Sequence, residues 1–134
     1  MGEVLERTRA AGIRFLARFD FSKANEVYYA EHPEWFYRSL SGKPVNYNQQ
    51  VHTCVNGYYQ KEYSLEILRE VLERYPIDGV FFNMFGYQTR DYSGNYHGIC
   101  QCDNCKQAFA EFSGRALPTI EDHDDPTFRL YQRF

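Results

Sequence analysis

The fold prediction depends on the stretch Ile77-Asp78-Gly79-Val80-Phe81-Phe82-Asn83-Met84-Phe85-Gly86. A short apolar run that follows a turn and ends at a glycine predicts a buried strand. Asn83 is the single polar side chain between residues 80 and 85. A polar, tyrosine-rich loop then leads to Cys100-Gln101-Cys102-Asp103-Asn104-Cys105. The sequence therefore predicts that the chain's functional groups follow the carboxyl end of this strand.

A helical pattern and an alternating pattern precede this strand. From residue 60 to residue 75, Leu65, Leu68 and Leu72 recur at helical spacing, and Pro76 ends the predicted helix. Residues 13–20 alternate instead between two faces, which predicts a second strand. One face carries Ile13, Phe15, Ala17 and Phe19, and the other carries Arg14, Leu16, Arg18 and Asp20.

Shorter elements complete the pattern. We predict helices over residues 3–11, 23–31 and 104–113, a hairpin over 34–45, a strand end at 51–57, and a helix that opens at Asp125-Pro126. Gly114 is the expected C-cap of the helix over 104–113. Because the last helix has only just begun at Phe134, we expect residues 1–134 to be one partial domain that continues beyond residue 134.

The order of these elements is typical of parallel βα units. Two or three such units cannot close a sheet, whereas a complete (β/α)8 barrel has eight strands and about 250 residues. We therefore predict part of a (β/α)8 TIM barrel. The alternative is a small open α/β domain, and the absence of a glycine-rich phosphate loop disfavours nucleotide binding by it. In a barrel, the strand ends that carry Arg18, Asp20 and Asn83 meet at the catalytic face.

The cysteine spacing predicts a metal site. Cys100, Cys102 and Cys105 form a C-x-C-x-x-C pattern, which can place three thiolates around one tetrahedral ion. Cys54 is the expected fourth ligand, with His97 and His52 as alternatives, and free thiols are the interpretation without a metal. Four thiolates leave no open position for water, so the predicted zinc is structural rather than catalytic.

Composition excludes several classes of protein. The chain has 134 residues, of which 43% are hydrophobic and 18% aromatic, and a formal net charge of -3. The absence of a basic surface excludes a nucleic-acid partner, and no apolar run is long enough to cross a membrane. Clustered cysteines fit a reducing compartment, so we expect a cytoplasmic protein. The aromatic excess indicates either packing under long loops or a stacking surface for a ligand.

Three stretches resemble a known family. They are residues 78–86, the loop Asp91-Tyr92-Ser93-Gly94-Asn95-Tyr96-His97-Gly98, and residues 100–105. Together they resemble the hypothetical glycosyl hydrolase 6 family of barrel proteins. Cys54 with the three clustered cysteines is similar to the zinc site of family 42 β-galactosidases, and His32-Pro33-Glu34-Trp35 with residues 78–86 resembles family 29 α-L-fucosidases. The resemblance covers residues 10 to 115.

The resemblance implies a carbohydrate-active protein but does not supply its mechanism. The fucosidase pattern has a nucleophilic aspartate where this chain has Asn83, and the β-galactosidase pattern has an Asn-Glu pair where this chain has Asn83-Met84. Retaining hydrolysis requires two carboxyl groups about 5 to 5.5 Å apart, so neither role transfers to this strand. The catalytic residues are therefore unassigned, and any proton donor is expected beyond residue 134.

The candidate sugar-binding residues lie at predicted strand ends or in the loops after them: Arg18, Asp20, Trp35, His52, Asn56, Asn83, Tyr87 and His97. Asp20 shares its face with Arg18, and a paired cation is expected to keep it ionised. Trp35 is either a sugar-stacking platform or an anchor of the core. The two histidines fit ordinary loop positions as well as a site, and Asn56 fits a turn with Gly57.

We therefore predict a glycoside-hydrolase-like barrel segment that binds carbohydrate and holds a structural zinc. The alternatives are a non-catalytic carbohydrate-binding or structural module that retains the zinc, and a zinc-dependent interaction module without a concave aromatic pocket. Two carboxylates near Asn83 would distinguish the enzyme from the module. Open strand edges also predict association into a homo-oligomer.

Overall fold

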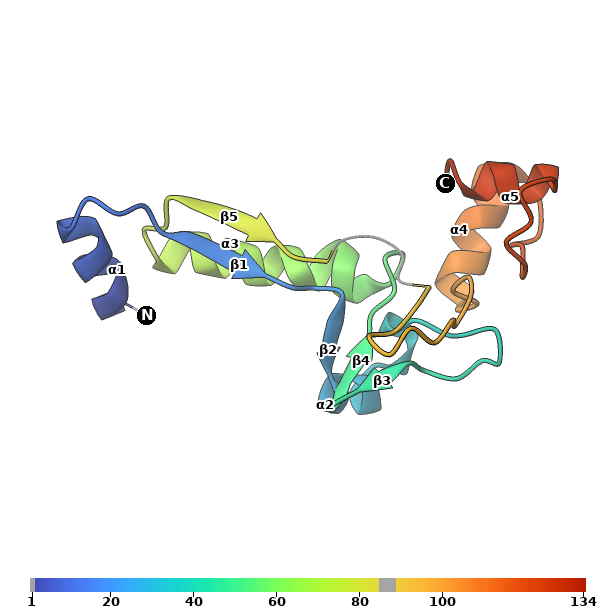
Figure 1. Cartoon of the computed structure of the whole chain (residues 1–134), viewed down its shortest axis with the longest axis horizontal. Coiled ribbons are helices and arrows are strands. Elements are labelled where there is room, and N and C mark those ends of the chain that lie inside the picture. The colour runs from blue at the N-terminus through green and yellow to red at the C-terminus, as the bar shows by residue number, and fades with distance from the viewer. Residues whose placement is uncertain (1, 85–88) are drawn as a thin grey trace.

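The computed structural model describes residues 2–84 and 89–134 and has a mixed α/β fold. Its elements are α1 (Gly2–Ala10), β1 (Leu16–Phe19), β2 (Lys23–Asn25), α2 (Glu26–Glu31), a 3-10 helix (Pro33–Trp35), β3 (Asn46–Tyr47), β4 (Gln50–His52), a π-helical turn (Tyr59–Tyr63), α3 (Ser64–Arg74), β5 (Gly79–Phe82), α4 (Asp103–Ser113) and α5 (Pro126–Tyr131). The molecule is elongated, with α1 near one end and α4 and α5 at the other (Figure 1).

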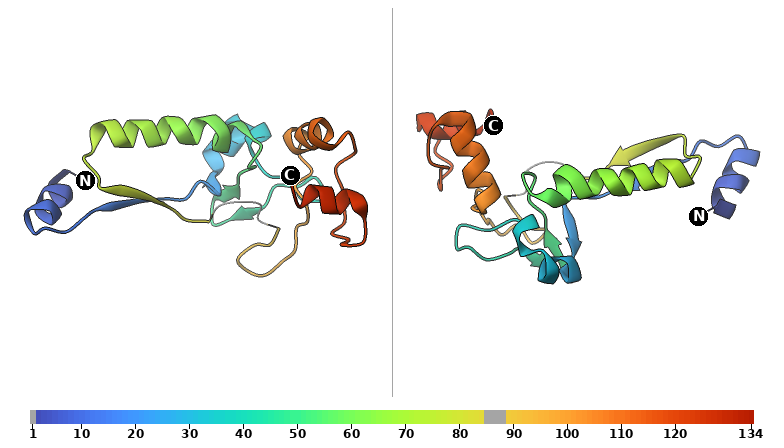
Figure 2. Two further views of the ribbon diagram at one scale, coloured as in Figure 1. Left: turned by 90° about the horizontal axis from the view of Figure 1, so that it is seen from above. Right: turned by 180° about the vertical axis from the view of Figure 1, so that it is seen from behind.

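A parallel pair, β1 and β5, forms the first sheet. Its register runs from Leu16 opposite Gly79 to Phe19 opposite Phe82, and α3 lies between the two strands in the sequence. Figure 2 shows α3 running alongside the pair. The predicted parallel βαβ order is therefore confirmed. The described residues contain two small sheets and no closed barrel.

The prediction that residues 77–86 form a buried strand is only half right. The strand exists, but Phe81 is 54% exposed and its neighbours Val80 and Phe82 are also exposed. The reason is that the sheet has two strands, and among the described elements only α3 runs beside it. The leucine stripe of α3 is likewise incompletely covered, since Leu65 and Leu72 are both about half exposed.

The second sheet is antiparallel, has the order β2-β4-β3, and corrects three predictions. Residues 23–25 are a strand rather than the start of a helix, because Lys23 pairs with His52 and the Asn25 side chain caps α2 by accepting from the Val27 amide. The predicted hairpin over 34–45 has its turn, with Gly42 at φ 75°, but no strands pair across it. The hairpin is formed by β3 and β4 instead. The predicted strand end at 51–57 stops at His52.

The helix ends follow the sequence closely except in α5, which ends at Tyr131 with Gln132 as its C-cap instead of continuing through Phe134. Gly114 is the C-cap of α4, with the left-handed φ of 67° that glycine tolerates best, as predicted. The Asp125 side chain accepts from the Thr127 amide and caps α5, with Pro126 at its first position. None of the helices in the described residues combines the length and hydrophobicity needed to span a lipid bilayer.

The two clusters of buried residues lie outside the parallel pair, of which only Ala17 is buried among the described residues. One cluster surrounds α2 and β4 and contains Phe36, Val51 and Tyr59. A larger cluster joins the segment before α4 to α4 and α5, with Ile99 and Phe109 at its centre. All four cysteines belong to this larger cluster, so the predicted metal site lies inside the larger of the two buried clusters.

Candidate functional site

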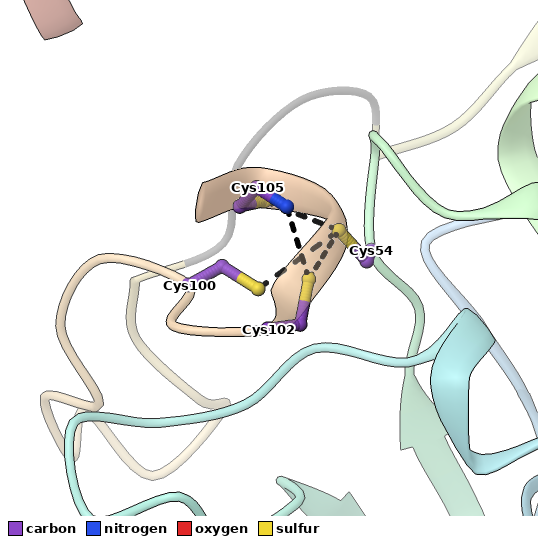
Figure 3. A group of neighbouring side chains, drawn as sticks. All are labelled: Cys54, Cys100, Cys102 and Cys105. Atoms are coloured by element: carbon purple, nitrogen blue, oxygen red, sulfur yellow. Dashed lines mark hydrogen bonds between the residues drawn. The ribbon is translucent and has the colours of Figure 1, made fainter. Parts of the chain in front are cut away.

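The four cysteine side chains converge from two distant parts of the chain (Figure 3). Cys54 follows β4, whereas Cys100 and Cys102 precede α4 and Cys105 lies in its first turn. The Sγ atom of Cys54 lies 3.3 Å from those of Cys102 and Cys105 and 3.9 Å from that of Cys100. All four sulfurs lie within 4.8 Å of one another, which confirms the predicted cluster with Cys54 as its fourth member.

Local geometry fixes each cysteine in place. Cys102 is the N-cap of α4, and its sulfur accepts from the Cys105 amide at 3.5 Å. The Arg38 amide donates to Cys100 at 3.5 Å, and the Asn56 side chain donates to Cys105 at 3.5 Å. Gly57 closes the turn after Cys54, where a Cβ atom would lie 2.7 Å from the Trp35 carbonyl oxygen. Backbone packing therefore requires glycine beside the cluster.

The donor set fits a metal ion. Thiolates about 2.3 Å from a tetrahedral zinc stand about 3.8 Å apart, close to the observed separations and far beyond a disulfide bond. The cysteines are buried and reduced. Hydrogen bonds from Cys100, Cys105 and Cys54 lower the pKa of Cys102, which favours negative charge on its sulfur. A cation would stabilise that charge, and four protein ligands leave it no open position.

A polar pocket of about 620 Å³ lies at the carboxyl ends of β1 and β5. Its lining residues come from β1, the positions just after β1 and β5, the second sheet, the π-helical turn and the loop before α4: Arg18, Asp20, Lys23, Ala24, Asn25, Gln50, Tyr59, Asn83 and Tyr92. Three of the predicted residues, Arg18, Asp20 and Asn83, meet there. The parallel pairing explains this meeting, because it places both strand ends at the same edge.

Asp20 is the acceptor at the centre of this pocket. Its carboxylate accepts from Ser22 at 2.5 Å, from Lys23 at 3.0 Å and from the Asn83 amide at 3.2 Å. Partial burial alone would raise the pKa of Asp20, but these hydrogen bonds outweigh burial and lower it. Asp20 is therefore ionised, as predicted. Its paired cation is Lys23 rather than Arg18, because the chain turns after β1 and brings the lysine back over the carboxylate.

Lys23 joins Asp20 to Tyr92. Its ammonium group donates to the Tyr92 hydroxyl at 2.6 Å and lies 4.9 Å from the centre of the Tyr92 ring. Burial alone would lower the pKa of Lys23, but the hydrogen bonds with Tyr92 and Asp20 raise it, so the lysine is charged. Tyr92 also packs on Tyr47, with ring centres 4.9 Å apart.

The other predicted residues lie elsewhere. The Trp35 ring stacks on the His32 ring, with ring centres 3.9 Å apart. Trp35 also packs against the buried cluster around α2 and β4. Asn56 contacts the cysteine cluster instead of the pocket. His97 pairs with Asp91 at 3.0 Å in the loop before Gly98. Tyr87 lies outside the described residues.

His52 is buried inside the second sheet. Neither ring nitrogen has a hydrogen-bond partner among the described residues. Burial lowers the pKa of His52, and the charges of Lys23 and His97 lower it further, so the imidazole is neutral. His52 and His97, the alternative fourth ligands, are both outside the group of four clustered cysteines.

Sequence reasoning missed six residues that line the pocket: Lys23, Ala24, Asn25, Gln50, Tyr59 and Tyr92. The sequence predicts Lys23 in a helix. Its contact with Asp20 follows only from the pairing of β2 with β4. Burial raises the pKa of Tyr59 to about 12, so this residue presents a neutral hydroxyl. The tyrosine-rich loop was the one available signal for Tyr92.

Comparisons with known proteins give a matching family and two similar folds. A family model described as "Hypothetical glycosyl hydrolase 6" matches residues 1–84, more than half of the chain. The search of curated proteins found no match. The fold resembles alpha-L-fucosidase isoenzyme 2 from Paenibacillus thiaminolyticus, with a TM-score of 0.67 and 19% identity over 98% of this chain and 18% of that chain.

A second solved structure is also similar. It is a noncanonic maltogenic alpha-amylase, AmyB, from Thermotoga neapolitana, with a TM-score of 0.52 and 22% identity over 64% of this chain and 21% of that chain. At these identities the likeness establishes fold alone. The chain spans about a fifth of the length of each of the two structures.

Proposed function

The chain belongs to the hypothetical glycosyl hydrolase 6 family, and from this membership we propose that it forms part of a carbohydrate-active (β/α)8 barrel. The likeness in fold to a fucosidase and an amylase supports a barrel, and the parallel βαβ arrangement of β1, α3 and β5 supports it further. Since the chain spans about a fifth of each of those proteins, we propose that the barrel domain continues beyond residue 134.

One observation carries the carbohydrate function. The polar pocket lies at the carboxyl ends of two parallel strands, where barrel enzymes place their active sites. Amide and hydroxyl groups from Asn25, Gln50, Asn83 and Tyr59 surround it, and such groups bind sugar hydroxyls. Tyr92 adds an aromatic ring that is half exposed, which supports stacking against the apolar face of a sugar.

Asp20 is the acidic group of this proposed site. An ionised carboxylate binds sugar hydroxyls or stabilises the positive charge that develops on the sugar ring, but a general acid needs a raised pKa. Asp20 is the single carboxylate among the described lining residues. Glycoside hydrolysis uses two, so in our proposal the proton donor comes from strands outside this chain.

The cysteine cluster supports a structural zinc in the same domain. Zinc is the preferred ion for four thiolates in tetrahedral array, and its role would be to hold the loop after β4 against the start of α4. The likeness of this site to family 42 β-galactosidases remains a prediction. Reduced buried thiols are consistent with the proposed cytoplasmic location.

One observation favours a second candidate function. Since the described pocket contains one carboxylate rather than two, the domain would also serve as a non-catalytic carbohydrate-binding module that retains the zinc. A second carboxylate brought to Asn83 by the rest of the barrel would favour the enzyme instead.

Removal of the Asp20 charge tests the carbohydrate site. We expect Asp20→Asn to weaken sugar binding about tenfold or more, because hydrogen bonds to charged groups are each worth about 1.5 to 3 kcal/mol. Binding of a panel of monosaccharides and oligosaccharides, measured by calorimetry or ligand-observed NMR, gives the result.

Asp124→Asn is the matched control, since the Asp124 side chain is fully exposed and far from the pocket lining. Two results would contradict the proposed sugar site: an Asp20→Asn variant that binds sugar as tightly as the wild type, or a wild-type protein that binds no sugar.

A further inference from the structure

The pocket carries more positive than negative charge. Arg18 and Lys23 are its cations and Asp20 is its one carboxylate among the described lining residues. The whole chain has a formal charge of -3, so a cationic pocket departs from the general charge of the molecule. The excess charge resides on one side chain, because Lys23 and Asp20 neutralise each other at 3.0 Å.

Arg18 is that unbalanced cation. Lys23 donates to both Asp20 and Tyr92, whereas Arg18 has no hydrogen bond or ion pair with any described residue. Residues 85–88 read Phe-Gly-Tyr-Gln and contain no acidic side chain, so they supply no counter-charge to it. Arg18 shares strand parity with Asp20 and lines the same pocket.

We infer that the pocket accepts an acidic sugar, a uronic acid residue, whose carboxylate binds the Arg18 guanidinium. This inference rests on the proposed carbohydrate function and specifies its substrate class. A guanidinium presents paired donors that match the two oxygens of a carboxylate. The Gln50 amide, the Asn25 amide NH2 and the Asn83 amide oxygen then remain for the sugar hydroxyls, and the ionised Asp20 faces the hydroxyls rather than the acid group.

The arrangement also orients the sugar. Asp20 repels a carboxylate that approaches it, whereas Arg18 attracts one. Asp20 is held by Ser22 and Lys23, so its position is fixed before a ligand arrives. A uronic acid would therefore bind with its carboxylate toward Arg18 and its hydroxyls toward Asp20 and Asn83.

The test compares sugars that differ in one group. D-glucuronate and D-glucose differ only in oxidation at C6, and D-glucose 6-sulfate offers an anion with a different shape. In the unaltered protein we expect glucuronate to bind about tenfold more tightly than glucose, with an advantage that shrinks as salt is raised. Binding of the sulfate as tight as that of glucuronate would overturn the carboxylate assignment.

Arg18→Gln should abolish most of this preference, and Arg18→Lys should retain only part of it, because lysine keeps the charge but not the paired donors. Arg14→Gln is the matched control. Arg14 lies just before β1 and does not line the pocket, and its removal should leave the preference unchanged.

The outcomes separate the two proposals. Equal affinity for glucose and glucuronate would overturn the inference and leave the carbohydrate function in place. Failure of every sugar to bind would overturn the carbohydrate function itself. A large loss of thermal stability in Arg18→Gln would show that another part of the protein supplies the counter-charge, which also overturns the inference.

Discussion

Asp20 illustrates how far single residues can be predicted here. Its place at a strand end and its ionised state follow from strand parity and the general effect of a nearby cation. The identity of that cation does not follow, because Lys23 reaches Asp20 only through a turn and a strand pairing that the local sequence conceals. Tyr92 lies 69 residues from its partner Lys23, a separation at which no local pattern gives information.

Acid titration should reveal the contribution of Asp20 to stability. Because its pKa is lowered in the folded state, it stabilises the fold fully above its unfolded value near 3.9, and this contribution is lost as the pH falls through the folded value. We expect Asp20→Asn to lower the free energy of unfolding by about 1 to 2 kcal/mol at pH 7.

Urea denaturation at pH 7, 5, 4 and 3 measures this difference. It should shrink once the pH is below about 4, where the wild-type carboxyl also becomes protonated. Asp124→Asn should show little difference at any pH, since that carboxylate is exposed. A gap between wild type and Asp20→Asn that widens toward low pH would contradict the assignment.

At the scale of secondary structure, strong periodicity was a better guide than short turns. The α3 leucine stripe, the alternation of β1 and the caps of α4 and α5 are strong local signals, and all of these elements are present. The β3-β4 hairpin was missed because its two-residue loop, Asn48-Gln49, lacks the glycine that usually marks such turns. Both residues nevertheless adopt positive φ, at 49° and 62°.

Gln49→Gly should stabilise the protein by about 0.5 to 1 kcal/mol. A non-glycine residue in the left-handed region is strained, and the backbone carbonyl that accepts from Glu26 remains in the variant. Thermal or urea unfolding measures the gain. Gln50→Gly, one residue later within β4, is the control and should be destabilising by about as much. A loss of stability in Gln49→Gly would show that its side chain matters more than its backbone.

For the whole molecule, the cysteine cluster organises the packing that the sequence could not specify. Spacing predicted the ligands but gave no indication that Ile99 and Phe128 would pack around them. In the parallel pair, the apolar side chains of β5 are exposed. Self-association through its open edges therefore stays a prediction.

Metal removal should destabilise the entire larger core. We expect about one zinc per chain by elemental analysis, and none in Cys102→Ser. Removal of the metal with a chelator should lower the free energy of unfolding by about 4 kcal/mol or more. This is the stabilisation that a bound ion gives to the folded state when its concentration is about a thousandfold above its dissociation constant. Re-addition of zinc should restore the loss, which serves as the control. Full stability in the stripped protein would leave the cluster as four free thiols.

The separation of the four cysteines in the sequence also imposes an order on biosynthesis. Cys54 precedes Cys100 by 46 residues, so at about 5 to 20 residues per second it emerges from the ribosome several seconds before its partners. When Cys100 is added to the chain, β1, α3 and β5 have all been synthesised, whereas α4 and α5 of the larger cluster have not. Within residues 1–134 the larger cluster is thus completed after the parallel pair, and capture of the proposed zinc becomes a step that closes a long loop around that cluster.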